Sequence, residues 1–161
     1  VILLAGCAQQ VLRPDINDAT IRLLARRGVD VEVAPNAGCC GALVHHMGRE
    51  QAAVAMAKAN VDAWMRVMDK GEAVDAIIIN ASGCGTTVKD YGHMFEGDPL
   101  AGDAAVVAGL ARDVTEVMAE LGLNAASAPP LRSMPSLGGQ PITQTARLAT
   151  RANRTRLIFQ P

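Results

Sequence analysis

The sequence predicts a small α/β domain in which helices cover both faces of a parallel sheet. Three short apolar segments, at residues 1–5, 29–34 and 74–80, have the length and composition of buried strands. Segments with helical periodicity lie between them and after the third. The predicted order is therefore β-α-β-α-β-α, and strands separated by helices pair in parallel through right-handed crossovers.

The third strand segment predicts that the sheet is covered on both faces. It reads VDAIIIN at residues 74–80, an almost continuous apolar run. A strand with one face in water alternates apolar and polar residues, whereas a strand buried on both faces is apolar throughout.

Apolar residues that recur every three or four positions predict three helices. The first ends before Gly28, the second spans about residues 49–70 and ends at Gly71, and the third runs from near Leu100 to Gly122. Glycine is the residue most common just after a helix, so these three positions suit helix ends. The apolar positions are Ile16, Ala19, Leu23 and Leu24; Ala53, Ala57, Trp64, Val67 and Met68; and Val107, Ala111, Val114, Met118 and Leu121.

The composition fits one domain with a small aliphatic core. Half of the 161 residues are apolar, but only 2% are aromatic. No apolar run approaches the ~20 residues that a membrane-spanning helix needs, and the opening VILLAG lacks the basic flank of a signal peptide. Because the chain starts at Val1 and enters a strand at once, we expect it to be a fragment of a longer subunit.

The net charge of −1 is spread unevenly along the chain. Residues 131–161 hold five arginines and no acidic residue, so the rest carries ten basic and sixteen acidic residues. An acidic body argues against a nucleic-acid partner, because phosphate backbones bind basic surfaces.

The four cysteines all follow predicted strands. Cys7 comes two residues after the first strand, Cys39 and Cys40 follow the second after a turn, and Cys84 follows the third. The carboxyl ends of parallel strands share one edge, and open α/β sheets bind their ligands there. We therefore expect the four thiols to converge on one metal site.

The residues around the cysteines suit a bulky anionic group. Cys40-Gly41 and Ser82-Gly83-Cys84-Gly85 stand where helices are expected to begin. Helix N-termini favour thiolates, and glycines let the backbone come close to a bound group. The candidates for residues next to the metal ligands are His46, Gly41, Ser82, Gly83, Gly85 and Thr87.

The adjacent pair Cys39–Cys40 favours a cluster over a single metal ion. A disulfide between neighbouring cysteines strains the intervening peptide, and a mononuclear tetrahedral site more often uses separated pairs such as C-x-x-C. Two adjacent thiolates can instead bind different irons of one cluster. The alternative is that some of these cysteines are ordinary small apolar residues of the core.

Three strings resemble the cysteine-rich, or CCG, domain family: GCAQQ at residues 6–10, GCCGALVHHMGRE at 38–50 and NASGCGTTVKDYG at 80–92. They are most similar to the first CCG repeat of the iron–sulfur subunit of bacterial glycolate oxidase. The resemblance covers residues 1–123 and implies that this segment is a CCG domain.

The resemblance also implies a function. Such a subunit relays electrons from FAD-containing subunits, which oxidise glycolate to glyoxylate, toward membrane quinones. The partners would be those flavin subunits and the remainder of its own iron–sulfur subunit. The location would be cytoplasmic, either free or peripheral to the inner membrane. The chain itself would be the part of an oxidoreductase that binds no substrate.

One departure from the family pattern bears on the cofactor. Related domains end in Cys-x-x-Cys and hold an unusual cluster with five cysteines, whereas here the position three after Cys84 is Thr87. Four thiolates fit an ordinary [4Fe-4S] cluster. Zinc is the alternative, because some CCG domains bind it.

Residues 124–161 form an atypical tail. They are rich in Ala, Pro, Ser, Thr, Gln and Arg and lack the second repeat that the family would place there. We expect either a disordered tail or out-of-frame sequence joined to a true domain.

Three polar residues near the cysteines are weaker candidates. His46 would be a further ligand or proton carrier, or a histidine on the helix surface. Lys89 and Tyr91 would screen the site, but we expect both to be ordinary surface residues.

Three functions remain open from the sequence. The first is electron transfer through one iron–sulfur cluster. The second is a zinc-binding or thiol-redox domain, and the third is a metal-free domain that docks subunits.

Overall fold

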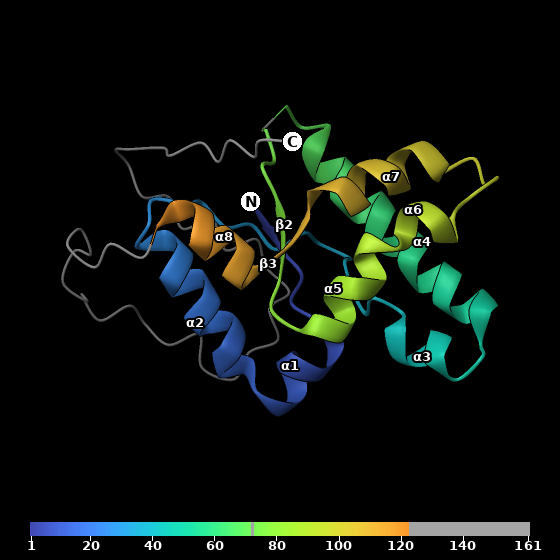
Figure 1. Cartoon of the computed structure of the whole chain (residues 1–161), viewed down its shortest axis with the longest axis horizontal. Helices are drawn as coiled ribbons and strands as arrows, with labels where there is room; N and C mark the ends of the chain where they lie inside the picture. Colours follow the sequence, from blue (N-terminus) through green and yellow to red (C-terminus); the bar gives the residue numbers. More distant parts are fainter. Residues whose placement is uncertain (72, 123–161) are drawn as a thin grey trace.

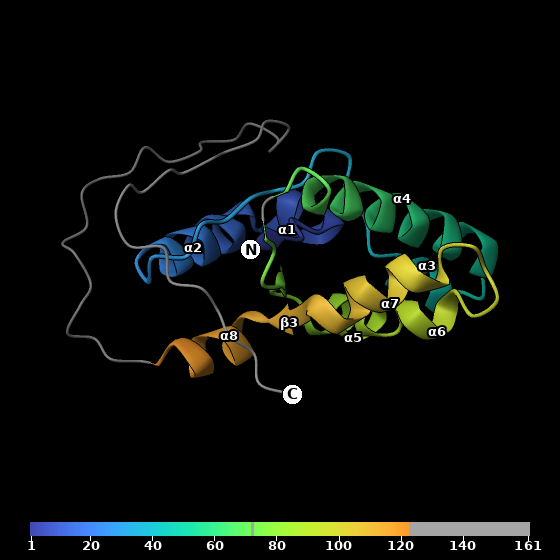
Figure 2. The same cartoon turned by 90° about the horizontal axis from the view of Figure 1, so that it is seen from above.

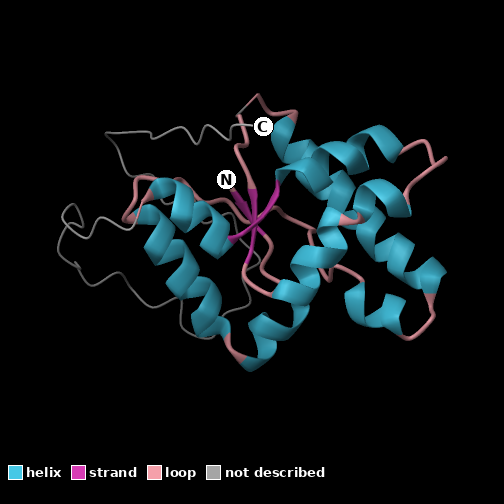
Figure 3. Cartoon of the chain, viewed as in Figure 1, coloured by secondary structure: helices cyan, strands magenta, loops and turns pink. Residues whose placement is uncertain are grey.

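The computed structural model describes residues 1–71 and 73–122, so the predicted tail at 124–161 lies outside the described residues. Helices surround a small central sheet (Figure 3). In chain order the elements are β1 (Ile2–Leu3), α1 (Cys7–Leu12), α2 (Pro14–Ala25), α3 (Ala42–His46), α4 (Glu50–Met68), β2 (Ile77–Ile79), α5 (Ser82–Lys89), α6 (Tyr91–Met94), α7 (Ala101–Leu110), β3 (Ala111–Asp113) and α8 (Val114–Leu121).

The sheet is parallel, with the strand order β1-β2-β3. Ile2 pairs with Ile77, and Ile77 pairs in turn with Ala111. The helices α2 and α8 lie on one face of the sheet, and α4, α5, α6 and α7 lie on the other (Figures 1 and 2). The predicted fold class, a small parallel sheet with helices on both faces, is therefore confirmed.

Alternate strand residues supply two separate cores. Ile77 and Ile79 pack with α4, α5 and α7, whereas Ile78 points the other way and packs with α2 and α8. All three isoleucines are at most 1% exposed. Each fully buried aliphatic side chain contributes about 1.5–3 kcal/mol, which explains why this strand is apolar on both faces.

The prediction of a strand at residues 29–34 is wrong. Only Glu32 pairs with the sheet, through a single parallel bridge to Ile2. The Leu3 N–H donates to the Glu32 carbonyl at 2.8 Å, and the Glu32 N–H donates to the Val1 carbonyl at 2.9 Å. This segment lies at the edge of the sheet with one neighbour, and Pro35 follows it without an N–H to extend a ladder.

The prediction of a single helix from Leu100 to Gly122 is also wrong. It is split into α7 and α8 by the strand β3. Val107 packs in the core of the α4 face, and Val117 and Met118 pack in the core of the α2 face. The apolar spacing matched one helix because two helices on opposite faces both present apolar residues to the sheet.

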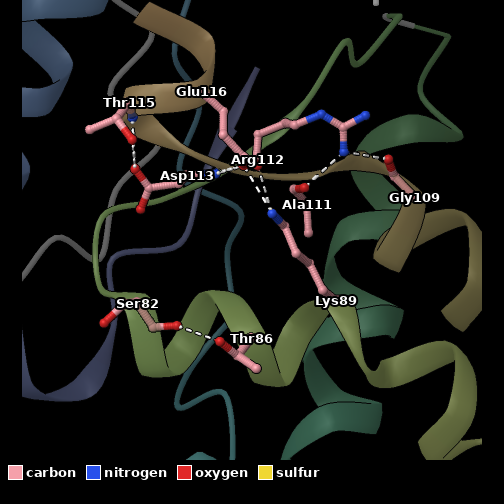
Figure 4. A network of polar contacts seen from close by, with 9 residues as sticks. All are labelled: Ser82, Thr86, Lys89, Gly109, Ala111, Arg112, Asp113, Thr115 and Glu116. Atoms are coloured by element: carbon pink, nitrogen blue, oxygen red, sulfur yellow. Dashed lines mark hydrogen bonds and ion pairs between the residues drawn. The ribbon is translucent and has the colours of Figure 1, made fainter. Parts of the chain in front are cut away.

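The start of α8 is set by a capping box. The Asp113 carboxylate accepts from the Thr115 N–H at 2.8 Å, and Glu116 accepts from the Asp113 N–H at 2.6 Å. Lys89 donates to both Glu116 oxygens, at 3.0 and 2.9 Å, and so ties α5 to this turn (Figure 4). The Asp113 N–H, and then Lys89, hold the pKa of Glu116 below its usual range.

We expect Asp113→Ala to lower the free energy of unfolding by about 0.5–2 kcal/mol, because the backbone N–H groups of Thr115 and Glu116 lose their acceptor. Urea unfolding of the chain followed by circular dichroism measures this. Asp113→Asn is the control, since asparagine caps helices equally well. Equal losses in the two variants would show that the cap is not what stabilises this turn.

Candidate functional site

The four cysteines lie at the carboxyl edge of the sheet. The strands β1 and β2 lead directly into α1 and α5 (Figure 1), so Cys7 is the first residue of α1 and Cys84 the third of α5. Cys39 and Cys40 end the segment that follows the Glu32 bridge and leads into α3. All four are free thiols: Cys7 is exposed, Cys39 and Cys84 are half-buried, and Cys40 is buried.

The four thiols are close enough to interact as one group, here called the thiol cluster. The Cys7 thiol donates to the Cys39 sulfur at 3.4 Å. The Cys40 thiol is hydrogen-bonded to Cys84. Negative charge on Cys7 or Cys39 also acts on the pKa of Cys84, which links the two pairs.

The hydrogen bonds within the thiol cluster separate the proton affinities of its members. Donation to Cys39, and then burial, raise the pKa of Cys7. Donation to Cys84, and then burial, raise the pKa of Cys40 far above the ordinary thiol value. The hydrogen bond from Cys40 lowers the pKa of Cys84. Cys84 is therefore stabilised as a thiolate, the form of cysteine that binds metals.

Gly41 shapes the turn that carries the vicinal pair. Its N–H donates to the Cys39 sulfur at 3.5 Å. Its φ of 87° is in the left-handed region, and a Cβ there would lie 3.0 Å from the backbone oxygen of Ala53. Glycine is thus required both by the backbone conformation and by the close approach of α4.

Gly41→Ala is expected to lower the free energy of unfolding by about 1–3 kcal/mol, because a strained conformation is added to a backbone clash. Thermal unfolding of the variant measures the loss. Gly38→Ala is the matched control: Gly38 lies three residues earlier, and a Cβ there meets nothing within 4 Å. A loss no larger at Gly41 than at Gly38 would contradict this account.

Two fully buried polar side chains hold the backbone of Cys39 and Cys40. Asn60, on α4, accepts from the Gly38 N–H at 2.7 Å and donates to the Cys39 carbonyl at 2.9 Å. The Tyr91 hydroxyl donates to the Cys40 carbonyl at 2.8 Å and accepts from Asn60 at 3.3 Å. Both side chains are 0% exposed. The vicinal pair is therefore fixed by α4 and α6 together.

The expectation that Tyr91 is a surface residue is wrong. Its ring stacks on Trp64, with centroids 6.4 Å apart, and meets Phe95 edge-on at 6.3 Å. Trp64 and Phe95 are themselves at most 1% exposed. Burial raises the pKa of Tyr91 well above its usual value. Lys89, by contrast, is at the surface as expected, paired with Glu116.

A second polar network ties the turns that carry Cys7 and Cys84. Asn80, at the end of β2, accepts from Gln9 of α1 at 2.9 Å and donates to Asn17 at 2.9 Å. Asn17 donates to the carbonyl of Ala5 at 2.7 Å, and it is 0% exposed. These contacts join α1, α2 and the end of β2 just ahead of the thiols.

The residues predicted to surround the ligands differ in whether they contact a cysteine. Gly41 contacts Cys39, whereas His46 is exposed on α3 and its ring packs against His45 at 6.1 Å. The Thr87 hydroxyl donates to the Gly83 carbonyl within α5, at 3.0 Å. Ser82 and Gly83 are exposed and Gly85 is half-buried, all in the first turn of α5.

No motif or spacing in the sequence pointed to Asn60, Asn80, Asn17 or Gln9 as residues of the site. Gln9 and Asn80 stand inside the strings quoted for the family, GCAQQ and NASGCG, which is the one signal that could have found them. Asn60 interrupts an otherwise apolar helix face, and a lone buried polar residue of that kind needs a partner.

The donor set of the thiol cluster fits an iron–sulfur cluster, because thiolates are the usual ligands of such clusters. Within residues 1–71 and 73–122, no three His, Cys, Asp or Glu side chains are arranged to hold a metal ion as they stand. The thiols hold protons in hydrogen-bonded pairs, and metal binding would release those protons and draw the sulfurs apart around the metal.

The fold and the thiol cluster together define a class: a small α/β domain with a four-thiol site at the carboxyl edge of a parallel sheet. The chain belongs to the family of the cysteine-rich domain (CCG), which matches residues 1–89. This confirms the family resemblance of the sequence.

The most informative relatives are iron–sulfur subunits. The chain is 44% identical over 121 residues to the glycolate oxidase iron-sulfur subunit of Escherichia coli (strain K12), covering 74% of this chain and 29% of that protein. It is 34% identical over 122 residues to the probable glycolate oxidase iron-sulfur subunit of Bacillus subtilis (strain 168), covering 75% and 26%.

A more distant relative is lactate utilization protein A of Bacillus thuringiensis (strain Al Hakam), 25% identical over 99 residues and covering 62% of this chain and 38% of that protein. The chain thus spans well under half the length of these relatives. No solved structure matches the chain significantly.

Proposed function

We propose that this domain is an electron-transfer module in which Cys7, Cys39, Cys40 and Cys84 hold one iron–sulfur cluster. The observation that carries the proposal is the convergence of four free thiols from three separate chain segments at one edge of the sheet. The names of the relatives support the same class of cofactor.

When bound, the cluster would accept and pass on single electrons. The residues of this chain bind and shield it unequally. Cys40 is backed by Tyr91, Trp64 and Phe95, which exclude water from that side. Cys7, by contrast, is exposed to solvent. We expect electrons to enter or leave through the Cys7 side, because a partner's redox group can come closest to the cluster where it is least covered.

We further propose a [4Fe-4S] cluster. Four thiolates satisfy such a cluster. Thr87 stands where related domains have a fifth cysteine, and its hydroxyl is occupied by the Gly83 carbonyl. A cluster that needs five thiolates from this domain does not fit that residue. Zinc on the same four thiols is the competing occupant.

The proposed setting is an oxidoreductase complex. The relatives are named as subunits of glycolate oxidase, so the proposed donor is a flavin subunit that oxidises glycolate or a similar 2-hydroxy acid. The remainder of a longer iron–sulfur subunit is the other partner. The described part of the chain contains no helix with the length and hydrophobicity to cross a membrane. We propose a cytoplasmic location, with contact to the inner membrane made through partners.

The surface near the thiols supports contact with another protein. Val11 and Leu12 are 80% and 74% exposed on α1, the helix that begins at Cys7. Leu43 and Met47 are 68% and 57% exposed on and just after α3, which follows Cys40. These exposed apolar side chains stand on or next to the two helices that begin at Cys7 and just after Cys40, where a partner would approach the cluster.

Iron, sulfide and zinc analysis tests the proposal. The full chain, purified without oxygen and reconstituted with iron and sulfide, is expected to bind about four irons and four sulfides, to absorb broadly near 400 nm and to give an EPR signal on reduction. Protein that retains no iron would refute the proposal. Stoichiometric zinc without iron would favour the competing occupant.

A further inference from the structure

The thiol cluster consists of two unequal pairs. Cys7 and Cys39 come from segments 32 residues apart, yet their sulfurs are 3.4 Å apart, and Cys7 is exposed to solvent. Cys40 and Cys84 form the inner pair, and Cys40 is buried. An oxidant from solution thus meets the outer pair first.

The competing disulfides are disfavoured by geometry. A bond between Cys39 and Cys40 would close a strained ring around the peptide between them. Asn60 holds the carbonyl of that peptide, and Tyr91 holds the carbonyl of Cys40, in the next peptide. In the inner pair, Cys40 is buried against the aromatic core and Cys84 is half-buried. Susceptibility of a thiol to oxidation follows both its thiolate character and its exposure. Cys84 ionises more readily than Cys7, but it is half-buried, whereas Cys7 is exposed to a peroxide in solution.

The outer pair closes by a small movement of Cys7. A disulfide needs a sulfur–sulfur distance of about 2.05 Å, so the two sulfurs must approach by a little over 1 Å. The backbone of Cys39 is held by Asn60, so the approach is made by Cys7. Cys7 also begins a short helix and so is held by the helix on one side only.

We propose that Cys7 and Cys39 form a reversible disulfide in the metal-free domain when a hydroperoxide is present. Once the Cys7 thiol has lost its proton, its sulfur attacks the peroxide and takes one oxygen. Cys7 becomes a sulfenic acid as the O–O bond breaks, and the other oxygen leaves with that proton as an alcohol or water. The Cys39 sulfur then attacks, the S–O bond breaks, and a water molecule leaves with the thiol proton. The two thiols lose two electrons and two protons, which the peroxide takes up.

The disulfide blocks loading of the metal site. It removes two of the four thiolates that the proposed function assigns to the cluster, and this consequence rests on that function. The inner pair cannot hold the cluster alone. A thiol reductant reverses the bond by thiol–disulfide exchange and restores the site.

Peptide mapping of the full metal-free chain tests the disulfide. One equivalent of hydrogen peroxide is expected to lower the number of free thiols from four to two and to join the tryptic peptide of Cys7 to that of residues 28–49. That peptide contains both Cys39 and Cys40, so variants are needed to assign the bond. Cys40→Ser should retain the cross-link, whereas Cys7→Ser and Cys39→Ser should each lose it.

The outcomes separate this inference from the proposed function. A cross-link that persists in Cys39→Ser, or one that joins Cys84 instead of Cys7, would overturn the proposed pairing. If the pairing holds, iron uptake should be lost in the oxidised chain and return after treatment with dithiothreitol. Should the reduced chain also take up no iron, the proposed function fails while the disulfide stands.

Discussion

Cys84→Ser is expected to abolish retention of the iron–sulfur cluster. Cys84 is the member of the thiol cluster whose pKa is lowered, by the hydrogen bond from Cys40, and serine oxygen is a poor ligand for the iron of such clusters. Iron and sulfide per chain after anaerobic reconstitution should fall from about four of each to the background level. The loss of absorption near 400 nm gives a second readout.

Thr86→Ala is the matched control for Cys84→Ser. Thr86 lies two residues further along α5, is exposed, and donates only to the Ser82 carbonyl, at 3.1 Å. Its variant should bind the same amount of iron as the original chain. If Cys84→Ser still holds a full complement of iron, Cys84 is not a ligand, and the four-thiol assignment fails with it.

Asn60→Leu is expected to cause the largest loss of stability in the metal-free domain, about 2–4 kcal/mol. Leucine has a similar volume but leaves the Gly38 N–H and the Cys39 carbonyl buried without their partner. Each unsatisfied group costs about 1–3 kcal/mol. Tyr91→Phe leaves the Cys40 carbonyl without its donor and removes the longer bond from Asn60, but Asn60 keeps its bonds to Gly38 and Cys39, so the loss should be smaller. Urea unfolding of the full chain measures both.

Gln51→Leu is the control for Asn60→Leu, because it makes the same kind of change on an exposed position of α4. It should alter the free energy of unfolding by no more than about 0.5 kcal/mol. A loss at Asn60 no greater than the loss at Gln51 would mean that water replaces the asparagine, and that the side chain does not hold the vicinal pair.

The layered fold could be predicted because its signal is local. The run IIIN at the end of the third segment, and the helix ends at Gly28 and Gly71, depend on residues a few positions apart. Burial on both faces follows from an apolar strand, and parallel pairing follows from the helices between strands. The metal-ligand candidates followed in the same way, from the position of each cysteine after a strand.

The strand β3 could not be read from apolar spacing, because the spacing continues across it. Val107 and Met118 belong to helices on opposite faces, yet they stand at helical intervals along the chain. The capping box of Asp113 and Glu116 was the local signal that a new helix begins there. The edge segment around Glu32 failed for a different reason, since strand length depends on which neighbours are available to pair.

The sequence by itself determined the fold class, the family, and the placing of four cysteines at one edge of the sheet, because strand order and residue position carry that information. Only the tertiary structure decided which thiols pair. It also decided that Asn60 and Tyr91, 31 residues apart in the chain, together hold the vicinal cysteines. Such contacts depend on how α4 and α6 pack against each other, and packing is set by the whole core rather than by any local pattern.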